Sequence, residues 1–244
     1  MNTAFSTTAK LLALLVLIVI GPATANGDDQ SRSAATPVLR EAQTLIEQGK
    51  HNLAIAVLDA AIKRDGRRGD LLLAKGCVKQ LANLHESALE DFSGAIELNF
   101  KLSSAYASRG TSHFALGDHK RAINDLNLAV QANPESATAY VLRGRFHFLK
   151  EEFRLALDDY NSAIRHDPDA RTYIARAFCH FEMNNYDEAA SDATAAIALD
   201  PDEPNPLYIR ASANKHLGKY DAALSDYRLA QQLEAKLKQA VTRK

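Results

Sequence analysis

The feature that most constrains this chain is an internal repeat with a period of 34 residues. Two alanines seven residues apart recur along the sequence, and successive pairs are separated by 34, 34, 34, 33 and 34 residues. The pairs are Ala54/Ala61, Ala88/Ala95, Ala122/Ala129, Ala156/Ala163, Ala189/Ala196 and Ala223/Ala230. Four places after each first alanine stands, in turn, Leu58, Phe92, Leu126, Tyr160, Ala193 and Tyr227. Offsets of zero, four and seven share one helical face, so each unit is predicted to contain an amphipathic helix.

A second helical pattern precedes these helices, with a large residue followed four places later by a small one. The pairs are Leu72/Gly76, Tyr106/Gly110, Tyr140/Gly144, Tyr173/Ala177 and Leu207/Ala211. Glycine or asparagine between the two helices allows the left-handed conformation that ends a helix. These turns are Gly49-Lys50, Gly117-Asp118, Asn184-Asn185 and Gly218-Lys219, and prolines at 134, 168 and 201 close three units. Each unit is therefore predicted to be a pair of antiparallel helices.

An isolated pair of short helices cannot bury its apolar faces, but a stack of such pairs can. We therefore expect an all-α solenoid of antiparallel helix pairs. Its six units are placed at residues 35–68, 69–102, 103–136, 137–169, 170–203 and 204–237. Ala235 stands where other units have proline, so the last helix is expected to continue into a basic tail at residues 238–244.

Segments such as AYASRGTSHFALGDHKRAINDLNLAVQANPESA and TYIARAFCHFEMNNYDEAASDATAAIALDPDEP resemble tetratricopeptide repeats. The resemblance covers nearly all of the chain after its N-terminal segment. It implies a right-handed superhelical solenoid in which the first helices line a concave, ligand-holding groove. The first and second units depart from the pattern, with Gly66 and Phe100 in place of the closing proline. Degenerate end units are expected as caps of a repeat array.

Charged residues also recur with the repeat. Lys75 and the arginines 109, 143, 176 and 210 precede the small residue of each first helix. Sixteen residues later stand the aspartates 91, 125, 159, 192 and 226. Antiparallel packing predicts structural ion pairs Arg109–Asp125, Arg143–Asp159, Arg176–Asp192 and Arg210–Asp226. The alternative is an arginine ladder that binds anions. If the pairs are exposed, each contributes only about 0–1 kcal/mol, so we expect them to fix the register of the helices.

The composition and the reactive residues argue against several functions. Lysine and arginine total 29 against 30 aspartates and glutamates, without the basic excess of a nucleic-acid binder. His113, His147 and His180 occupy equivalent places, but helices about 10 Å apart cannot bring them to the roughly 2 Å that zinc requires. Cys77 and Cys179 lie three units apart and are expected to be buried, unpaired thiols. The chain has no motif for catalysis, so we expect no enzyme activity, no cofactor and no metal.

The N-terminal 25 residues have the pattern of a signal peptide. An apolar run from Leu11 to Ile20 follows Lys10, and Ala23-Thr24-Ala25 provides a small-x-small cleavage site. The run is half of the roughly 20 residues that a membrane span needs; the alternative is an uncleaved signal-anchor. We therefore expect export to a bacterial periplasm or outside the cell, with no membrane span after cleavage. Residues 26–34 are predicted to be a disordered polar leader.

The resemblance also implies a partial map of the groove. One stripe of the first helices lies about 100° from the packing stripe and carries apolar residues that a solvated helix would not need. The candidate groove residues are Val141, Arg145, Arg171, Ile174, Phe178, Tyr208 and Ser212. Equivalent residues in the second unit are Leu73, Cys77 and Gln80, and in the third Ala107, Thr111 and Phe114. The alternative is that the phenylalanines are buried between neighbouring helices.

These patterns predict a non-catalytic scaffold that binds another protein. Apolar anchors in the groove favour an extended peptide or an amphipathic helix as the partner, rather than a carboxylate clamp. The alternative is a structural subunit of an envelope assembly that acts through the ends of the stack or by self-association.

Overall fold

A computed structural model describes residues 32–242 of the 244-residue chain. Within these residues all regular secondary structure is helical, as predicted. The predicted signal peptide, residues 1–25, lies outside the described residues. Between residues 32 and 242, no helix combines the length and the hydropathy needed to cross a bilayer.

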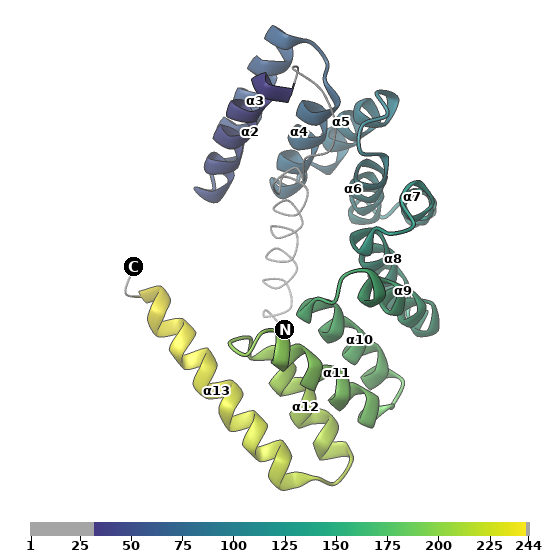
Figure 1. Ribbon diagram of the computed structural model, residues 1–244, viewed down its shortest axis with the longest axis vertical. Helices are drawn as coiled ribbons and strands as arrows, with labels where there is room; N and C mark the ends of the chain where they lie inside the picture. Colours follow the sequence, from purple (N-terminus) through teal and green to yellow (C-terminus); the bar gives the residue numbers. More distant parts are fainter. Residues whose placement is uncertain (1–31, 243–244) are drawn as a thin grey trace. The chain divides into compact units, whose positions relative to one another are not determined.

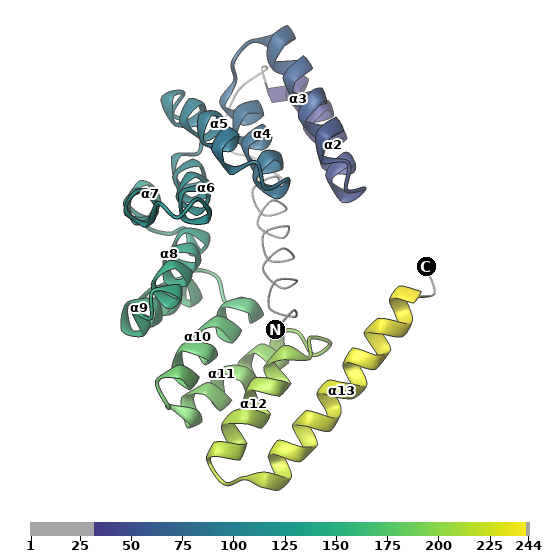
Figure 2. The same cartoon turned by 180° about the vertical axis from the view of Figure 1, so that it is seen from behind.

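The helices fall into two compact units that divide after Pro134. The first contains α2 (Arg32–Glu47), α3 (His51–Asp65), α4 (Gly69–Leu81), α5 (His85–Glu97), α6 (Leu102–Ala115) and α7 (His119–Ala132). The second contains α8 (Ala137–Leu149), α9 (Phe153–His166), α10 (Ala170–Glu182), α11 (Tyr186–Leu199), α12 (Asn205–His216) and α13 (Tyr220–Thr242). Within each unit, consecutive helices form antiparallel pairs that stack on one another (Figures 1 and 2). The expected all-α solenoid architecture is confirmed.

The same turn joins the two helices of every pair. Its left-handed residue is, in turn, Gly49, Asn83, Gly117, Glu151, Asn184 and Gly218, with φ between 59° and 80°. The N–H after this residue donates to a carbonyl five residues back, as Lys50 does to Leu45 at 2.8 Å. These bonds define a Schellman turn, which satisfies the last carbonyls of the first helix. Glu151 was not predicted as a turn residue, because glutamate gives no sequence signal for positive φ.

The repeating alanines form the interior of each helix pair. From Ala54 to Ala196 they are 0–3% exposed, and Ala230 is fully buried. The small residue of the first helix allows equally close packing. At Gly144, an added Cβ would lie 2.9 Å from Cε1 of the buried Tyr160. The spacing of small residues therefore sets how closely the helices approach.

The helix boundaries correct one prediction and extend another. Residues 26–34 were expected to be a disordered leader, but α2 begins at Arg32, so residues 32–34 are helical. Ala34 and Ala35 favour helix over coil and account for this earlier start; residues 26–31 are not among those described. At the other end, α13 runs for 23 residues to Thr242. The last helix therefore continues past residue 237, in agreement with the absence of a closing proline.

Candidate functional site

The repeating cations pair with the aspartates sixteen residues later. Arg176 on α10 donates from Nε and Nη2 to the carboxylate of Asp192 on α11, at 2.8 and 2.6 Å. Arg109–Asp125, Arg143–Asp159 and Arg210–Asp226 make the same two-point contact. In the second of the six units the cation is Lys75, whose Nζ lies 2.9 Å from the Asp91 carboxylate. A two-point contact fixes the orientation of the guanidinium as well as its distance.

The carboxylates of these pairs are buried. The aspartates 91, 125, 159, 192 and 226 are only 2–8% exposed. Hydrogen bonding to Asp192 raises the pKa of Arg176, and the same cause raises the pKa of its repeat equivalents Arg109, Arg143 and Arg210. A buried carboxylate depends on its partner far more than an exposed one does. The contribution of about 0–1 kcal/mol that an exposed ion pair makes to stability therefore does not apply to these pairs.

The cations also hold the helix pairs to one another. Arg176 donates through Nη1 to the side-chain carbonyl of Asn161 on α9, at 2.7 Å. Equivalent contacts to the preceding pair join Lys75 to Asp59, Arg109 to Ser93 and Arg210 to Thr194, at 2.9–3.1 Å. Each of these cations therefore clamps three helices, which was not predicted. With these donors engaged inside the stack, the arrangement favours a structural clamp over an anion-binding ladder.

The three aligned histidines lie beside the same aspartates. Nε2 of His113, His147 and His180 stands 3.8–3.9 Å from Asp125, Asp159 and Asp192. Burial lowers the pKa of His113 and His180, although the nearby aspartates act in the opposite direction. These two imidazoles are therefore neutral at pH 7. In the part of the chain that the structure describes, no group of His, Cys, Asp and Glu residues is arranged to hold a metal ion.

Both cysteines are buried and unpaired, as predicted. Burial raises the pKa of the Cys77 thiol and of the Cys179 thiol to about 12. A thiol with so high a pKa is protonated at neutral pH and a poor nucleophile. Neither cysteine has the setting of a catalytic residue.

The candidate groove residues differ in exposure. Phe178 on α10 is 44% exposed, and Ser212 on α12 is also exposed. Arg171 is exposed and donates from Nε to Asp169 at 3.2 Å, next to the start of α10. The other four candidates, Val141, Arg145, Ile174 and Tyr208, are half-buried.

Two of these half-buried residues have contacts within the stack. Ile174 packs against the core formed by Ala177, Ala193 and Ile209. The Tyr208 ring meets the Tyr227 ring edge-on, with centroids 5.5 Å apart. Both side chains therefore have a structural role in addition to any groove role.

In the first compact unit no residue of the same stripe is exposed: four are buried, and Thr111 and Phe114 are half-buried. Leu73, Cys77 and Ala107 are 1–2% exposed. The Gln80 amide, only 6% exposed, donates to the Thr111 hydroxyl at 2.6 Å and so joins α4 to α6. Gln80 belongs to the predicted stripe, but this bridge was not predicted. Its only sequence signal is a polar residue among apolar ones, which is weak. The exposed part of the stripe thus lies on α10 and α12.

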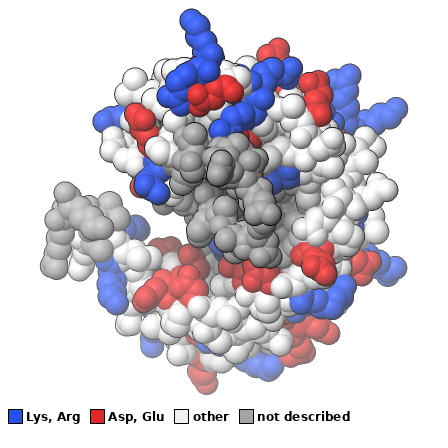
Figure 3. Space-filling view, turned by 45° about the horizontal axis from the view of Figure 1, so that its top comes forward, with Lys and Arg blue, Asp and Glu red and all other residues white. Residues whose placement is uncertain are grey.

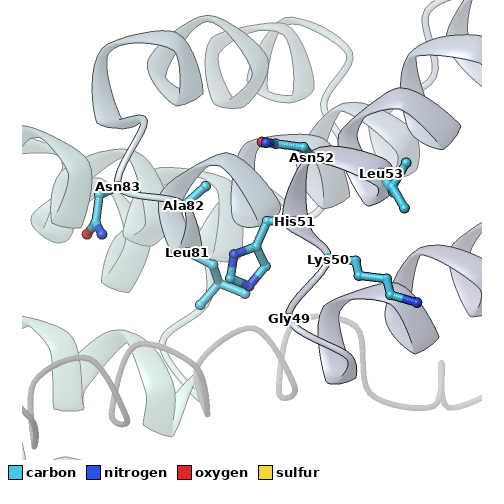
Figure 4. Close-up of a pocket in the computed structure, with 8 residues that line it drawn as sticks. All are labelled: Gly49, Lys50, His51, Asn52, Leu53, Leu81, Ala82 and Asn83. Carbon is cyan, nitrogen blue, oxygen red and sulfur yellow. The ribbon is translucent and has the colours of Figure 1, made fainter.

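Two shallow pockets lie elsewhere, between the turns of neighbouring helix pairs. One, of about 500 Å³, is formed by residues 49–53 of one turn and 81–83 of the next (Figure 4). The other, of about 340 Å³, is formed by residues 151–155 and Met183. No candidate groove residue lines either pocket. Basic and acidic side chains lie interspersed on the face shown in Figure 3, without a broad area of one charge.

The comparisons with known proteins identify the repeat. Three family models, each described as tetratricopeptide repeat, match residues 107–171, 170–203 and 205–237. The chain is 38% identical over 77 residues to the human mitochondrial import receptor subunit TOM34, covering 31% of this chain and 25% of TOM34. It spans a quarter or less of the curated relatives TOM34, unc-45 homolog B and SGT1.

Solved structures share the fold at low identity. A tetratricopeptide repeat protein of Thermus thermophilus, TTC0263, is 21% identical, with a TM-score of 0.63 over 72% of this chain and 97% of its own. YrrB, a tetratricopeptide repeat protein with an unusual peptide-binding site, is 20% identical, with a TM-score of 0.58 over 76% and 96%. The three matches together cover more than half of the chain, and the last two span the helix pairs α10–α11 and α12–α13. On this evidence the chain belongs to the tetratricopeptide repeat family.

Proposed function

We propose that this chain is a non-catalytic interaction scaffold that holds an extended peptide or an amphipathic helix against α10 and α12. The observation that carries the proposal is the exposure of Phe178. Among the phenylalanines of residues 32–242, it alone is largely exposed, at 44%. Exposed aromatic side chains beside polar ones are typical anchors of protein interfaces.

The neighbours of Phe178 supply the other parts of such a site. Arg171, Ile174 and Phe178 lie at offsets of zero, three and seven, which share one face of α10. The first helix of the following pair, α12, contacts α10 and adds the exposed Ser212. The site thus combines an aromatic anchor, a half-buried aliphatic residue, a cation and a small polar residue. This composition suits a ligand with apolar side chains at regular intervals.

The relatives support a protein ligand. YrrB carries a peptide-binding site on the same fold, and TOM34 is an import receptor subunit. The features of the site itself support the choice of surface, because the equivalent stripe of the first compact unit has no exposed residue. We place the ligand on α10 and α12 for that reason.

The test is peptide selection followed by a matched pair of variants. A displayed random-peptide library is panned against the chain, and selected peptides are measured by fluorescence anisotropy. Phe178→Ala is expected to weaken their binding at least tenfold, as for an interface anchor worth about 1.4 kcal/mol or more. Leu155→Ala is the control, because Leu155 is 49% exposed but lies on the second helix α9. Equal binding by the Phe178 variant and wild type would refute the site, provided that circular dichroism shows equal helicity.

We also propose that the chain is exported to a periplasm or secreted, with cleavage after Ala25. The support is the apolar run Leu11–Ile20 and the small residues before the cleavage site. N-terminal sequencing of the protein recovered from its native compartment is expected to begin at Asn26. A sequence that begins at Met1 or Asn2 would refute cleavage.

A second candidate function is assembly through an end of the stack. The observation that favours it is the exposure of Tyr227, whose equivalents in the other pairs are buried. An envelope assembly subunit would use such a surface. The two surfaces meet at the contact between the Tyr208 and Tyr227 rings, so Phe178, which lies on α10, is the residue that tests the groove by itself.

A further inference from the structure

One half-buried cation of the chain, Arg145 on α8, has no partner of opposite charge. Between residues 37 and 239, where exposure is described, eight lysines and arginines are half-buried. Seven of them lie 2.6–2.9 Å from a carboxylate oxygen: the five repeat cations of the ion pairs described above, Arg68 and Lys79. Within the described residues, the Arg145 side chain makes no ion pair and no hydrogen bond. It is therefore a cation that is partly removed from water without a carboxylate to compensate it.

The guanidinium of Arg145 lies near the core that α9 and α10 share. Tyr160 of α9 and Cys179 of α10 belong to that core. Burial raises the pKa of Tyr160, and Arg145 acts on this pKa in the opposite direction, so the two groups are close. A phenol with a raised pKa is uncharged at pH 7 and does not neutralise the guanidinium. Asp169, which precedes α10, is already engaged by Arg171.

Arg145 stands in one row with two residues of the proposed ligand site. Arg145, Phe178 and Ser212 occupy the same place in successive units, 33 and 34 residues apart. They lie on α8, α10 and α12, the first helices of three consecutive pairs in the second compact unit (Figure 1). Helix α10 contacts both α8 and α12, and packed helices stand about 8–10 Å apart. A ligand that crosses these helices therefore meets the unpaired cation next to the exposed phenylalanine.

We propose that Arg145 binds the side-chain carboxylate of an aspartate or glutamate in the ligand, while an apolar ligand residue contacts Phe178. This inference rests on the proposed function, because it extends the same site to α8. A guanidinium can hold a carboxylate by two parallel hydrogen bonds, as Arg176 does with Asp192. Since Arg145 has already lost part of its hydration, it gives up less water on binding than an exposed arginine does. Arginine is also one of the residues enriched at the energetic centres of protein interfaces.

The positions of Arg145 and Phe178 predict the spacing of the two ligand residues. An extended chain advances about 3.3 Å per residue, so a distance of about 8–10 Å between the helices corresponds to about three residues. In an α-helix, residues about seven places apart lie on the same face and about 10 Å apart along the axis. The ligand is therefore a segment in which an acidic residue stands about three places from an apolar one when extended, or about seven when helical.

The test is a double-mutant cycle with the peptides selected against the wild-type chain, which are expected to contain an aspartate or glutamate. Arg145→Met keeps an unbranched stem and should weaken the binding of an acidic peptide about ten- to hundredfold in fluorescence anisotropy, as for lost hydrogen bonds to a charged group. On the wild-type chain, changing that peptide residue to asparagine or glutamine should weaken binding by a similar factor. This neutral peptide should bind equally to Arg145→Met and to wild type. Arg154→Met is the control, because Arg154 is exposed on the second helix α9 and should not affect binding.

Three results would overturn the proposal: selected peptides without an acidic residue, an Arg145→Met chain that binds acidic peptides as wild type does, or equal weakening of acidic and neutral peptides. Amidation of the peptide C-terminus should leave binding unchanged, and its loss would assign the carboxylate to the chain end instead. The outcome is separate from that of the proposed function. If Phe178→Ala weakens binding and Arg145→Met does not, the surface stands and the carboxylate assignment is wrong. If only Arg145→Met weakens binding, the carboxylate assignment stands and the aromatic anchor is wrong.

Discussion

The clamp formed by Arg176 permits a quantitative prediction. Arg176→Met removes the donors to Asp192 and Asn161 while keeping an unbranched side chain of similar reach. We expect it to lower the free energy of unfolding by about 3–5 kcal/mol, which is the cost of leaving one partner of a buried ion pair unpaired. The reason is that Asp192 is only 6% exposed and receives two hydrogen bonds, of 2.8 and 2.6 Å, from this one guanidinium.

The magnitude follows from the contacts that Arg176 makes. Opposite charges about 4 Å apart attract by about 4 kcal/mol at an effective dielectric constant near 20. The bond to Asn161, at 2.7 Å, adds about 1 kcal/mol. Packing of the guanidinium over the Tyr173 ring, 5.4 Å from its centroid, adds about 0.5–1 kcal/mol. Desolvation of the charges offsets part of this total, which leaves a loss in the stated range.

Urea unfolding followed by circular dichroism measures the effect, with two further variants for comparison. Lys219→Met breaks the exposed pair Lys219–Asp187, whose side chains are 56% and 73% exposed, and should cost no more than about 1 kcal/mol. Arg176→Met combined with Asp192→Leu should be more stable than Arg176→Met alone, because no buried carboxylate is left unpaired. If Arg176→Met costs as little as Lys219→Met, or if the double variant is the less stable, the burial argument is wrong.

Three further predictions concern packing, pH and reactivity. Gly144→Ala should lower the free energy of unfolding, measured in urea, by up to about 2 kcal/mol. The added Cβ overlaps with the Tyr160 ring, and this cost exceeds the roughly 1 kcal/mol gain in helix propensity. Adding Tyr160→Leu to the Gly144→Ala chain should restore part of the loss. The pKa values of His113 and His180 are lowered by burial, so the unfolded chain binds more protons below about pH 6.5 and stability should fall as pH drops below that value. Replacing both histidines with glutamine should flatten this part of the urea-midpoint profile, and an unchanged slope would contradict the assignment. The Cys179 thiol, buried and with its pKa raised to about 12, should react with a thiol reagent only as fast as the chain opens; rapid reaction of the native protein would show that it is accessible.

Much of the fold follows from local sequence patterns. The alanine pairs, the small residues of the first helices and the turn residues predict the helix pairs and most of their boundaries. The sixteen-residue spacing predicts which arginine meets which aspartate, because two antiparallel helices joined by a fixed turn can pair in only one register. Glu151 shows the limit of this reasoning. It adopts positive φ because the stack imposes the turn, and not because glutamate favours it.

The candidate site could be predicted less completely. The stripe that was mapped onto a groove is buried at Leu73 and Cys77, half-buried at Ile174 and exposed at Phe178. Leu73 and Ile174 occupy equivalent positions in the repeat, and so do Cys77 and Phe178. Periodicity alone therefore cannot distinguish the buried member of each pair from the more exposed one. Their exposure depends on the size of the side chains that neighbouring helices bring against them.

The sequence by itself therefore determined the repeat, the pairing of the helices and the partners of the repeated charges, since these depend on spacing along one chain. Only the tertiary structure decided how deeply the aspartates are buried, which cations reach back to the preceding pair, and which apolar residues meet water. Tyr160 and Tyr227 occupy the same place in their units, yet one is 1% exposed and the other 48%. The difference arises because burial depends on what packs next to a residue: a further helix pair packs against α9, and within residues 32–242 none packs against α13.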